Sequence, residues 1–389
     1  MRSSISTSSS RTSRARSTNF SRLPTEAASQ ADRVYLDHAA GTWVLPEVVQ
    51  ALEAVPRGNA SSPHAEGQRA LAALDAARDD AARALGVEPA EIVFTSSGTE
   101  AVNLALLGAG RRLPPGASVV TWAAEHQAVL GAVRRLQLEG RRTEILPVGQ
   151  DGLNSEAHLP NAGLVSTSLA NNEVGTIQPR IHAPGALVHL DACQGAQWLD
   201  LDLRGIDLAS LSGHKLGAGQ GGLLFVRSGT RLEPLMYGGP QERGRRAGWE
   251  DVRSAVAMAT ALTICAERRE GWSAVVRPLG QRLRRALAAA GGRLTGAERS
   301  LPGHASATFS GTRGEDLLLA LDLAGLAASS GSACASGSLD PSHVLLAMGF
   351  SLEDSLSSLR LTASWSTTEV DVVRAETVLR SILAPLVRA

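Results

Sequence analysis

Lysine is almost missing from this chain of 389 residues. Of its 38 basic residues only Lys215 is a lysine, and all the others are arginines. Arginine can supply positive charge anywhere on a surface, but it cannot lose its proton and form an imine as lysine can. The single lysine is therefore a candidate for covalent chemistry. On composition alone, the alternative that one lysine remained in the sequence by chance stays open.

Cysteine is also scarce, because the chain contains only Cys193, Cys265 and Cys334. These three are too few and too scattered for a disulfide framework or a zinc site, and no metal site is expected. Their scarcity indicates a reducing compartment, in which an important cysteine acts as a single thiol. We therefore expect a cytoplasmic protein.

Long apolar runs and an excess of one charge are absent as well. No run approaches the roughly 18 apolar residues that a membrane span needs. The 38 acidic residues balance the 38 basic ones, and no basic stripe is visible. Neither a membrane nor a nucleic acid is therefore an expected partner. The length suits two lobes of ordinary size.

Residues 1–33 differ from the rest of the chain. They contain ten serines and six arginines but only two acids, Glu26 and Asp32. Such a composition is typical of an organellar (mitochondrial or plastid) transit peptide, and a disordered tail or an over-long gene start explains it equally simply. In each case the segment is expected to lie outside the fold.

Short apolar runs alternate with helical patterns from residue 34 onward. The helical patterns cover residues 67–85 and 126–139. This alternation predicts an α/β fold with a mostly parallel sheet and helices on both faces. The expected buried strands are residues 92–94, 118–122, 163–167, 186–190 and 222–226.

A second, smaller lobe is expected after a long helix at residues 268–290. Patterns at 305–310, 315–321 and 358–363 predict an α+β arrangement there. No full helix fits between Gln178 and Asp191, because this stretch contains two prolines. The predicted division is an extension (1–33), a segment packing with the small domain (34–50), a large domain (51–267) and a small domain (268–389).

Lys215 lies in a context that suits ligand binding. Ser212 and His214 precede it, and a glycine-rich run at 217–222 follows. A lysine at this position can reach a ligand that lies against the sheet, and the hydroxyl and imidazole can donate hydrogen bonds to a phosphate.

Two predicted strand ends carry further polar groups. The strand at 186–190 is followed by Asp191 and Gln194, where a carboxylate can pair with a protonated ring nitrogen. The strand at 92–94 is followed by residues 95–100 and a helix, whose first N–H groups can hold a phosphate. Taken singly, each of these features is equally consistent with a simple helix cap.

Cys334 differs from the other two cysteines in its surroundings. It lies in residues 329–338, a stretch of small and hydroxyl side chains with no apolar face. A structural cysteine is usually buried, whereas this one is expected in an exposed loop, which favours a nucleophile. Cys193 and Cys265 are predicted to be small core residues.

Taken together in their order along the chain, these sequence segments resemble those of cysteine desulfurases of the NifS/IscS type, which are class V aminotransferase-like, fold-type-I enzymes. The resemblance extends from about Tyr35 to Val373 and includes Tyr-Leu-Asp-His-Ala-Ala at 35–40, Ser-Gly-His-Lys at 212–215 and Ser-Ser-Gly-Ser-Ala-Cys at 329–334. The other landmarks are residues 58–64, 94–103, 125–130, 171–175, 189–194, 238–248, 341–345 and 359–360. Counted with residues 329–334 and 341–345 as one landmark, these are ten landmarks in family order, which together are far more specific than any one of them.

The resemblance implies pyridoxal 5'-phosphate (PLP) as the cofactor, bound covalently by Lys215. It implies a large domain with a seven-stranded type of sheet and a smaller α+β domain. It also implies that Cys334 takes sulfur from L-cysteine as a persulfide and passes it to an acceptor protein, such as an iron–sulfur scaffold. The implied roles of the other residues are a ring-stacking proton carrier (His126), the pyridine-nitrogen partner (Asp191), a contact to the phenolic oxygen (Gln194), phosphate ligands (Gly98, Thr99, Ser212, His214) and substrate-carboxylate ligands (Asn172, Arg360).

The resemblance further implies a homodimer, in which residues 238–248 lie near the neighbour's cofactor. Trp249 stands where the family usually has a threonine that reaches the partner's phosphate. Two alternatives to a desulfurase stay open. One is a relative with other PLP chemistry, such as a selenocysteine lyase or another C–S lyase. The other is a non-catalytic partner protein.

Overall fold

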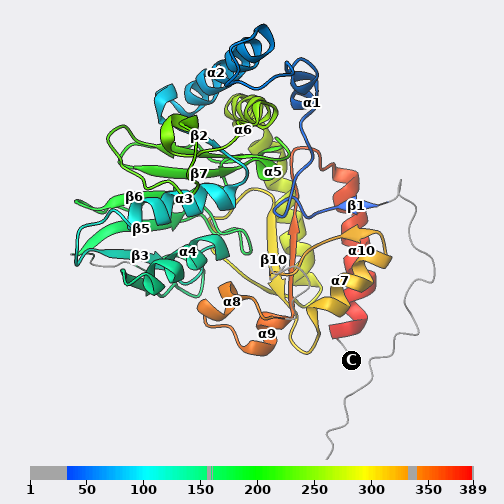
Figure 1. Ribbon diagram of the computed structural model, residues 1–389. Coiled ribbons are helices and arrows are strands. Elements are labelled where there is room, and N and C mark those ends of the chain that lie inside the picture. The colour runs from blue at the N-terminus through cyan, green and yellow to red at the C-terminus, as the bar shows by residue number, and fades with distance from the viewer. Residues whose placement is uncertain (1–32, 156–158, 160, 332–339, 388–389) are drawn as a thin grey trace, which may run out of the picture.

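The computed structural model describes residues 33–155, 159, 161–331 and 340–387 (Figure 1). Its centre is a seven-stranded sheet in which only β8 runs antiparallel to both of its neighbours. The predicted mostly parallel sheet is therefore confirmed. In spatial order the strands are β2 (Ile92–Thr95), β8 (Gly222–Val226), β7 (Leu208–Ser212), β6 (Leu187–Asp191), β5 (Ala162–Ser168), β3 (Ser118–Trp122) and β4 (Arg142–Leu146).

All five predicted strands of the large lobe are present, but the sequence patterns did not reveal β4 and β7. β4 is an edge strand with exposed and half-buried residues, so it has no continuous apolar run. β7 is buried throughout, yet its Leu-Ala-Ser-Leu-Ser sequence is interrupted by two serines. One of these serines, Ser210, has a polar partner inside the fold, as described below.

Helices cover both faces of this sheet, as predicted. Along β8, Leu223 and Phe225 pack in one apolar cluster with α2 and α6, whereas Leu224 and Val226 pack in another with α3 and α4. The alternation follows from the two-residue period of a strand. The bounds of these helices and their small neighbours are α1 (Pro46–Glu53), α2 (Ala65–Leu85), α3 (Gly98–Gly110), α4 (Gln127–Leu138), α5 (Gly213–Leu216) and α6 (Val252–Ala289).

Helix α6 joins the two lobes and begins 16 residues before the predicted start at 268. Its first part packs against the large lobe through Met258, Leu262 and Cys265. Its last part packs against the small lobe through Leu279 and Leu283. The helix itself continues across the predicted domain boundary, but none of residues 266–275 is buried, and the face that packs changes its partner from the large lobe to the small lobe over this stretch.

The smaller lobe has the predicted α+β arrangement. Its antiparallel sheet contains β9 (Arg293–Leu294), β10 (His304–Thr308) and β12 (Ser358–Thr362), and β1 (Val34–Tyr35) pairs in parallel with β11 (Leu326–Ala327). The N-terminal strand thus attaches to a segment almost 300 residues further along the chain. The helices here are α7 (Gly314–Leu323), α8 (His343–Ala347), α9 (Leu352–Leu356) and α10 (Glu369–Val387), and short 3₁₀ turns occur at η2 (Pro89–Glu91) and η3 (Gln241–Gly244).

The connection between β5 and β6 contains no helix, as the prolines Pro179 and Pro184 predicted. Parallel neighbours are usually joined by a helical crossover. Here Ile181 and Ala183 instead pack beside Trp122. In the described part of the chain, none of the helices combines the length and apolar character that a membrane crossing requires.

Candidate active site

A cavity of about 370 Å³ opens where the carboxyl ends of β2, β5 and β6 meet the small lobe. Ligands of open α/β sheets bind at such strand ends. Ten of the predicted site residues line this cavity, and the eleventh, Cys334, lies outside the described residues. The ten are Gly98, Thr99, His126, Asn172, Asp191, Gln194, Ser212, His214, Lys215 and Arg360.

The N-terminus of α3 forms one wall of the cavity. Ser97 caps the helix by accepting a hydrogen bond from the Glu100 N–H. A Cβ atom at Gly98 would lie 2.6 Å from Cys193 Sγ and 2.8 Å from Ser212 Cβ, so glycine is needed for this close approach. The unpaired N–H groups of the first turn make this wall attractive to an anion.

Lys215 lies in the short helix α5, which directly follows β7. Beside it, His214 Nδ1 is 3.0 Å from Ser212 Oγ. Burial, helped by the positive charge of Lys215, lowers the pKa of His214 to about 4, so this imidazole is neutral at physiological pH. The cavity therefore combines an amine, a hydroxyl and a neutral imidazole within four consecutive residues.

Asp191 ends β6 and is held by a chain of hydrogen bonds from inside the sheet. Its Oδ1 accepts from the Cys193 N–H (3.0 Å) and from Ser210 Oγ (3.2 Å). Ser210 in turn contacts His189 Nε2 (3.2 Å), and His189 Nδ1 contacts Ser166 Oγ (2.9 Å).

The direction of this chain follows from chemistry. Because the Ser210 hydroxyl donates to Asp191, it accepts from His189 Nε2–H, and Nδ1 then accepts from Ser166. Burial lowers the pKa of His189 to about 4, so the ring remains neutral. Neither His189 nor Ser210 was predicted to take part in the site, although His189 lies in one of the landmarks.

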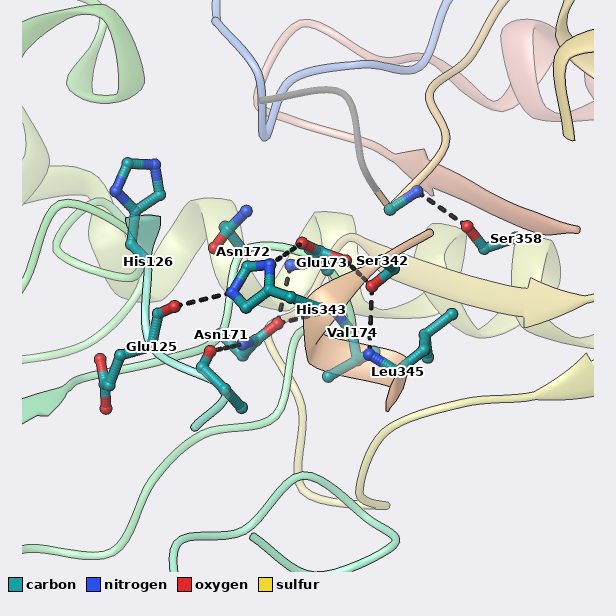
Figure 2. A network of polar contacts seen from close by, with 12 residues as sticks. Glu125, His126, Asn171, Asn172, Glu173, Val174, Ser342, His343, Leu345 and Ser358 are labelled. Carbon is teal, nitrogen blue, oxygen red and sulfur yellow. Dashed lines mark hydrogen bonds and ion pairs between the residues drawn. The ribbon is translucent and has the colours of Figure 1, made fainter. Parts of the chain in front are cut away.

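His126 caps the N-terminus of α4. Its Nδ1 accepts from the Ala128 N–H at 3.1 Å, which leaves the proton of the neutral ring on Nε2. Burial and then the charge of Lys215 lower the pKa of His126. The neighbouring Glu125 side chain points away from His126 (Figure 2) and accepts from the Ser168 N–H at 2.9 Å.

Arg360 reaches the cavity from β12 and joins three segments of the chain. Its Nη1 donates to Asn172 O at 2.9 Å, and its Nη2 forms an ion pair with Asp37 Oδ1 at 2.7 Å. The side chain is almost fully buried, so these partners fix its orientation. Asp37 belongs to the 35–40 landmark, but its contact with Arg360 was not predicted.

Cys193 corrects a prediction from the sequence. It was expected to be a core residue, but it lines the cavity beside Gly98 and Asp191. Burial raises the pKa of its thiol well above the usual value, so it is protonated and a poor nucleophile. Cys265 is buried in α6 as predicted, and burial raises its thiol pKa to about 12.

Comparisons with known proteins identify relatives over most of the chain. The IscS-like cysteine desulfurase of Mycobacterium tuberculosis is 41% identical over 382 residues, covering 91% of this chain and 97% of that protein. A cysteine desulfurase IscS of Clostridium botulinum is 38% identical, covering 90% and 94%.

Solved structures share the fold over a similar range. A NifS-like protein has a TM-score of 0.83 and 31% identity, covering 92% of this chain and all of that one. A structure of SspA in complex with cysteine has a TM-score of 0.70 and 29% identity, covering 86% of this chain and 100% of that one. The family model described as aminotransferase class-V matches residues 34–374. This match, the fold and the relatives lead to one conclusion: the chain belongs to the aminotransferase class-V family.

Proposed function

We propose that this protein is a PLP-dependent cysteine desulfurase, which converts L-cysteine to L-alanine and transfers the sulfur to Cys334 and then to an acceptor protein. The observation that carries the proposal is that the chain's only lysine, Lys215, lines the same cavity as Asp191 and the N-terminus of α3. The similarity to cysteine desulfurases over about nine-tenths of the chain supports it.

The residues of the cavity fit PLP. The first turn of α3, with Ser212 and His214 beside it, suits a phosphate, and Asp191 suits a protonated pyridine nitrogen. Oε1 of Gln194 is buried without a hydrogen-bond partner among the described residues. An orphaned polar atom in a cavity wall is expected where a bound molecule supplies the partner. When bound, PLP would withdraw electrons from the Cα of the amino acid.

The side chains of the cavity would bind the cofactor and the substrate and would transfer protons. Lys215 would bind the cofactor covalently and move the Cα proton of the substrate. His126, neutral and with its proton on Nε2, can exchange a proton at the same cavity. Arg360 and Asn172 suit the substrate carboxylate, and Asp37 keeps the guanidinium oriented.

Sulfur transfer would need a thiolate, which Cys334 would provide. Its sulfur attacks the sulfur of the substrate, an S–S bond forms and the C–S bond breaks. The carbon skeleton keeps the electron pair of the broken bond, is protonated and leaves as alanine. Cys193 and Cys265 are unsuited to this step, because burial keeps both thiols protonated.

We further propose a cytoplasmic homodimer, with an iron–sulfur scaffold or another thiolation protein as the acceptor. Tyr237 and Trp249 are 75% and 69% exposed, and together with Met236 they line an open groove beside residues 238–248. Exposed aromatic side chains around such a groove are typical of a protein interface. A sedimentation velocity experiment on the PLP-loaded protein should give twice the mass of the chain.

The proposed activity can be tested on the purified protein. It should be yellow, with an absorbance band in the region of roughly 390–420 nm that is typical of lysine-bound PLP. Adding L-cysteine should change this band and release alanine, with sulfide in the presence of a thiol reductant. A colourless protein that takes up no added PLP would instead support a non-catalytic role.

Ser210→Ala is expected to weaken PLP binding about tenfold, because it removes one hydrogen bond to a carboxylate and leaves His189 Nε2–H without its acceptor. The dissociation constant is measured by titration of the apoprotein followed at the absorbance band. Ser210→Cys keeps the approximate size but donates weakly, so it should give an intermediate value. Equal affinity in all three proteins would rule out this role of Ser210.

A further inference from the structure

Glu173 is a buried carboxylate between the two lobes that has no part in the chemistry described above. Only 3% of its surface is exposed. Burial raises its pKa to about 7, even though Ser342 and then Arg360 favour the charged form. An ionisable side chain buried at this cost is poorly explained by stability alone.

The backbone around Glu173 is held firmly. Asn171 Oδ1 accepts from the N–H groups of Glu173 (2.8 Å) and Val174 (3.0 Å), and Asn171 Nδ2 donates to Ala124 O (2.9 Å). Gly175, which follows Val174, has a φ of 75°, a left-handed backbone conformation that favours glycine. This rigid turn directs the Glu173 side chain toward the small lobe, as Figure 2 shows.

On the small lobe, Glu173 meets the N-terminus of α8. Ser342 caps this helix by accepting from the Leu345 N–H at 3.1 Å, so its own hydrogen is free to donate to Glu173 Oε2 at 2.5 Å. The adjacent His343 donates from Nε2 to Glu125 O at 2.9 Å, and its Nδ1 lies 3.9 Å from Glu173 Oε1. Figure 2 shows these contacts converging on one short stretch of chain.

Glu173 also contacts Gly331, which approaches from the other direction. A Cβ atom at Gly331 would lie only 2.6 Å from Glu173 Oε2, so the backbone runs directly against the carboxylate. The Gly331 N–H donates to Ser358 Oγ at 3.0 Å, which ties it to β12. Glu173 Oε2 therefore accepts a hydrogen bond from Ser342, shortly after residue 339, and lies close to Gly331, just before residue 332.

We propose that Glu173 is a positioning residue for sulfur transfer, which holds Gly331 and Ser342 beside the lobe that carries Asn172 and Lys215. This inference rests on the proposed function, because Cys334 lies between the two residues in the sequence. The turn of residues 171–175 includes Asn172, whose backbone oxygen binds Arg360. Glu173 thus connects Gly331 and Ser342, which flank Cys334 in the sequence, to the turn that carries Asn172.

The test uses the PLP-loaded protein and separates two steps in a single turnover. The first readout is the rate of the absorbance change on adding L-cysteine, and the second is the rate at which persulfide appears on Cys334, followed by mass spectrometry. Ser342→Ala and Glu173→Ala should leave the first rate within about twofold and slow the second about tenfold, because only the placement of the thiol changes. Ser342→Thr keeps the hydroxyl and should restore the second rate.

Both alanine substitutions remove the Glu173–Ser342 hydrogen bond, so combining them should slow persulfide formation by less than the product of their separate effects. A purely structural role would lower both rates and the melting temperature together, also in Ser342→Ala, and would overturn the proposal. Unchanged persulfide rates in all variants would overturn it as well. If the parent protein shows neither an absorbance change nor a persulfide, the desulfurase function fails and this inference fails with it.

Discussion

Lys215→Ala is expected to abolish the covalent attachment of PLP and to reduce turnover of L-cysteine by at least about 10³-fold. In the proposed mechanism the substitution removes both the amine that binds the cofactor and the base that moves the Cα proton, and the chain has no second lysine to replace it. The absorbance band of the purified variant should be lost or shifted. Borohydride reduction followed by mass spectrometry should locate PLP on residue 215 in the parent protein alone.

Lys215→Arg is the matched control. Arginine keeps the positive charge beside His214 and His126 but cannot form an imine at any accessible pH. It should therefore be as inactive as Lys215→Ala while retaining more affinity for the phosphate group. Normal turnover by either variant would remove Lys215 from the proposed mechanism and would require another attachment for the cofactor.

Cys334→Ser is expected to separate cofactor chemistry from sulfur transfer. In the proposed mechanism, binding of L-cysteine depends on Lys215, Asp191 and Arg360 and needs no protein thiol, so the absorbance change should persist. Release of alanine should fall by about 10² to 10³-fold, because serine at neutral pH provides no comparable nucleophile and cannot hold a persulfide. Alanine release and persulfide content report the loss directly.

Cys193→Ser serves as the control, because Cys193 lines the cavity yet its thiol is protonated. It should retain most of the activity. If Cys193→Ser were inactive while Cys334→Ser kept the parent rate, the nucleophile would have been assigned to the wrong cysteine. Full activity in both variants would indicate a lyase that expels sulfur without a protein thiol.

Local sequence patterns predicted much of the fold and part of the cavity, and the family resemblance supplied the other predicted site residues. An apolar run followed by a polar residue marks the end of a buried strand, and two such ends carry Thr95 and Asp191. In a parallel sheet these ends gather at one edge. The same patterns failed for β7, whose serines interrupt the run, and for the start of α6, whose first half packs on the large lobe.

Contacts between distant segments could not be read from such patterns. Asp37 and Arg360 are 323 residues apart in sequence, and Glu173 and Ser342 are 169 apart. Each pair forms because the packing of both lobes brings it together, and no local spacing indicates which acid meets which partner. The resemblance identified the sequence landmarks that contain these four residues, but it did not predict which of them pair.

The sequence by itself determined the fold class, the family and ten of the residues that line the cavity, because these follow from local periodicity, from residue types such as a single lysine and from the resemblance of its motifs to those of a known family. Only the tertiary structure decided which protonation states those residues have. The pKa of His214 falls to about 4 and that of Glu173 rises to about 7 because surrounding segments exclude water from both side chains. Burial is a property of the packed chain, so the neutral His214, the protonated thiol of Cys193 and the position of Glu173 between the lobes emerge only after folding.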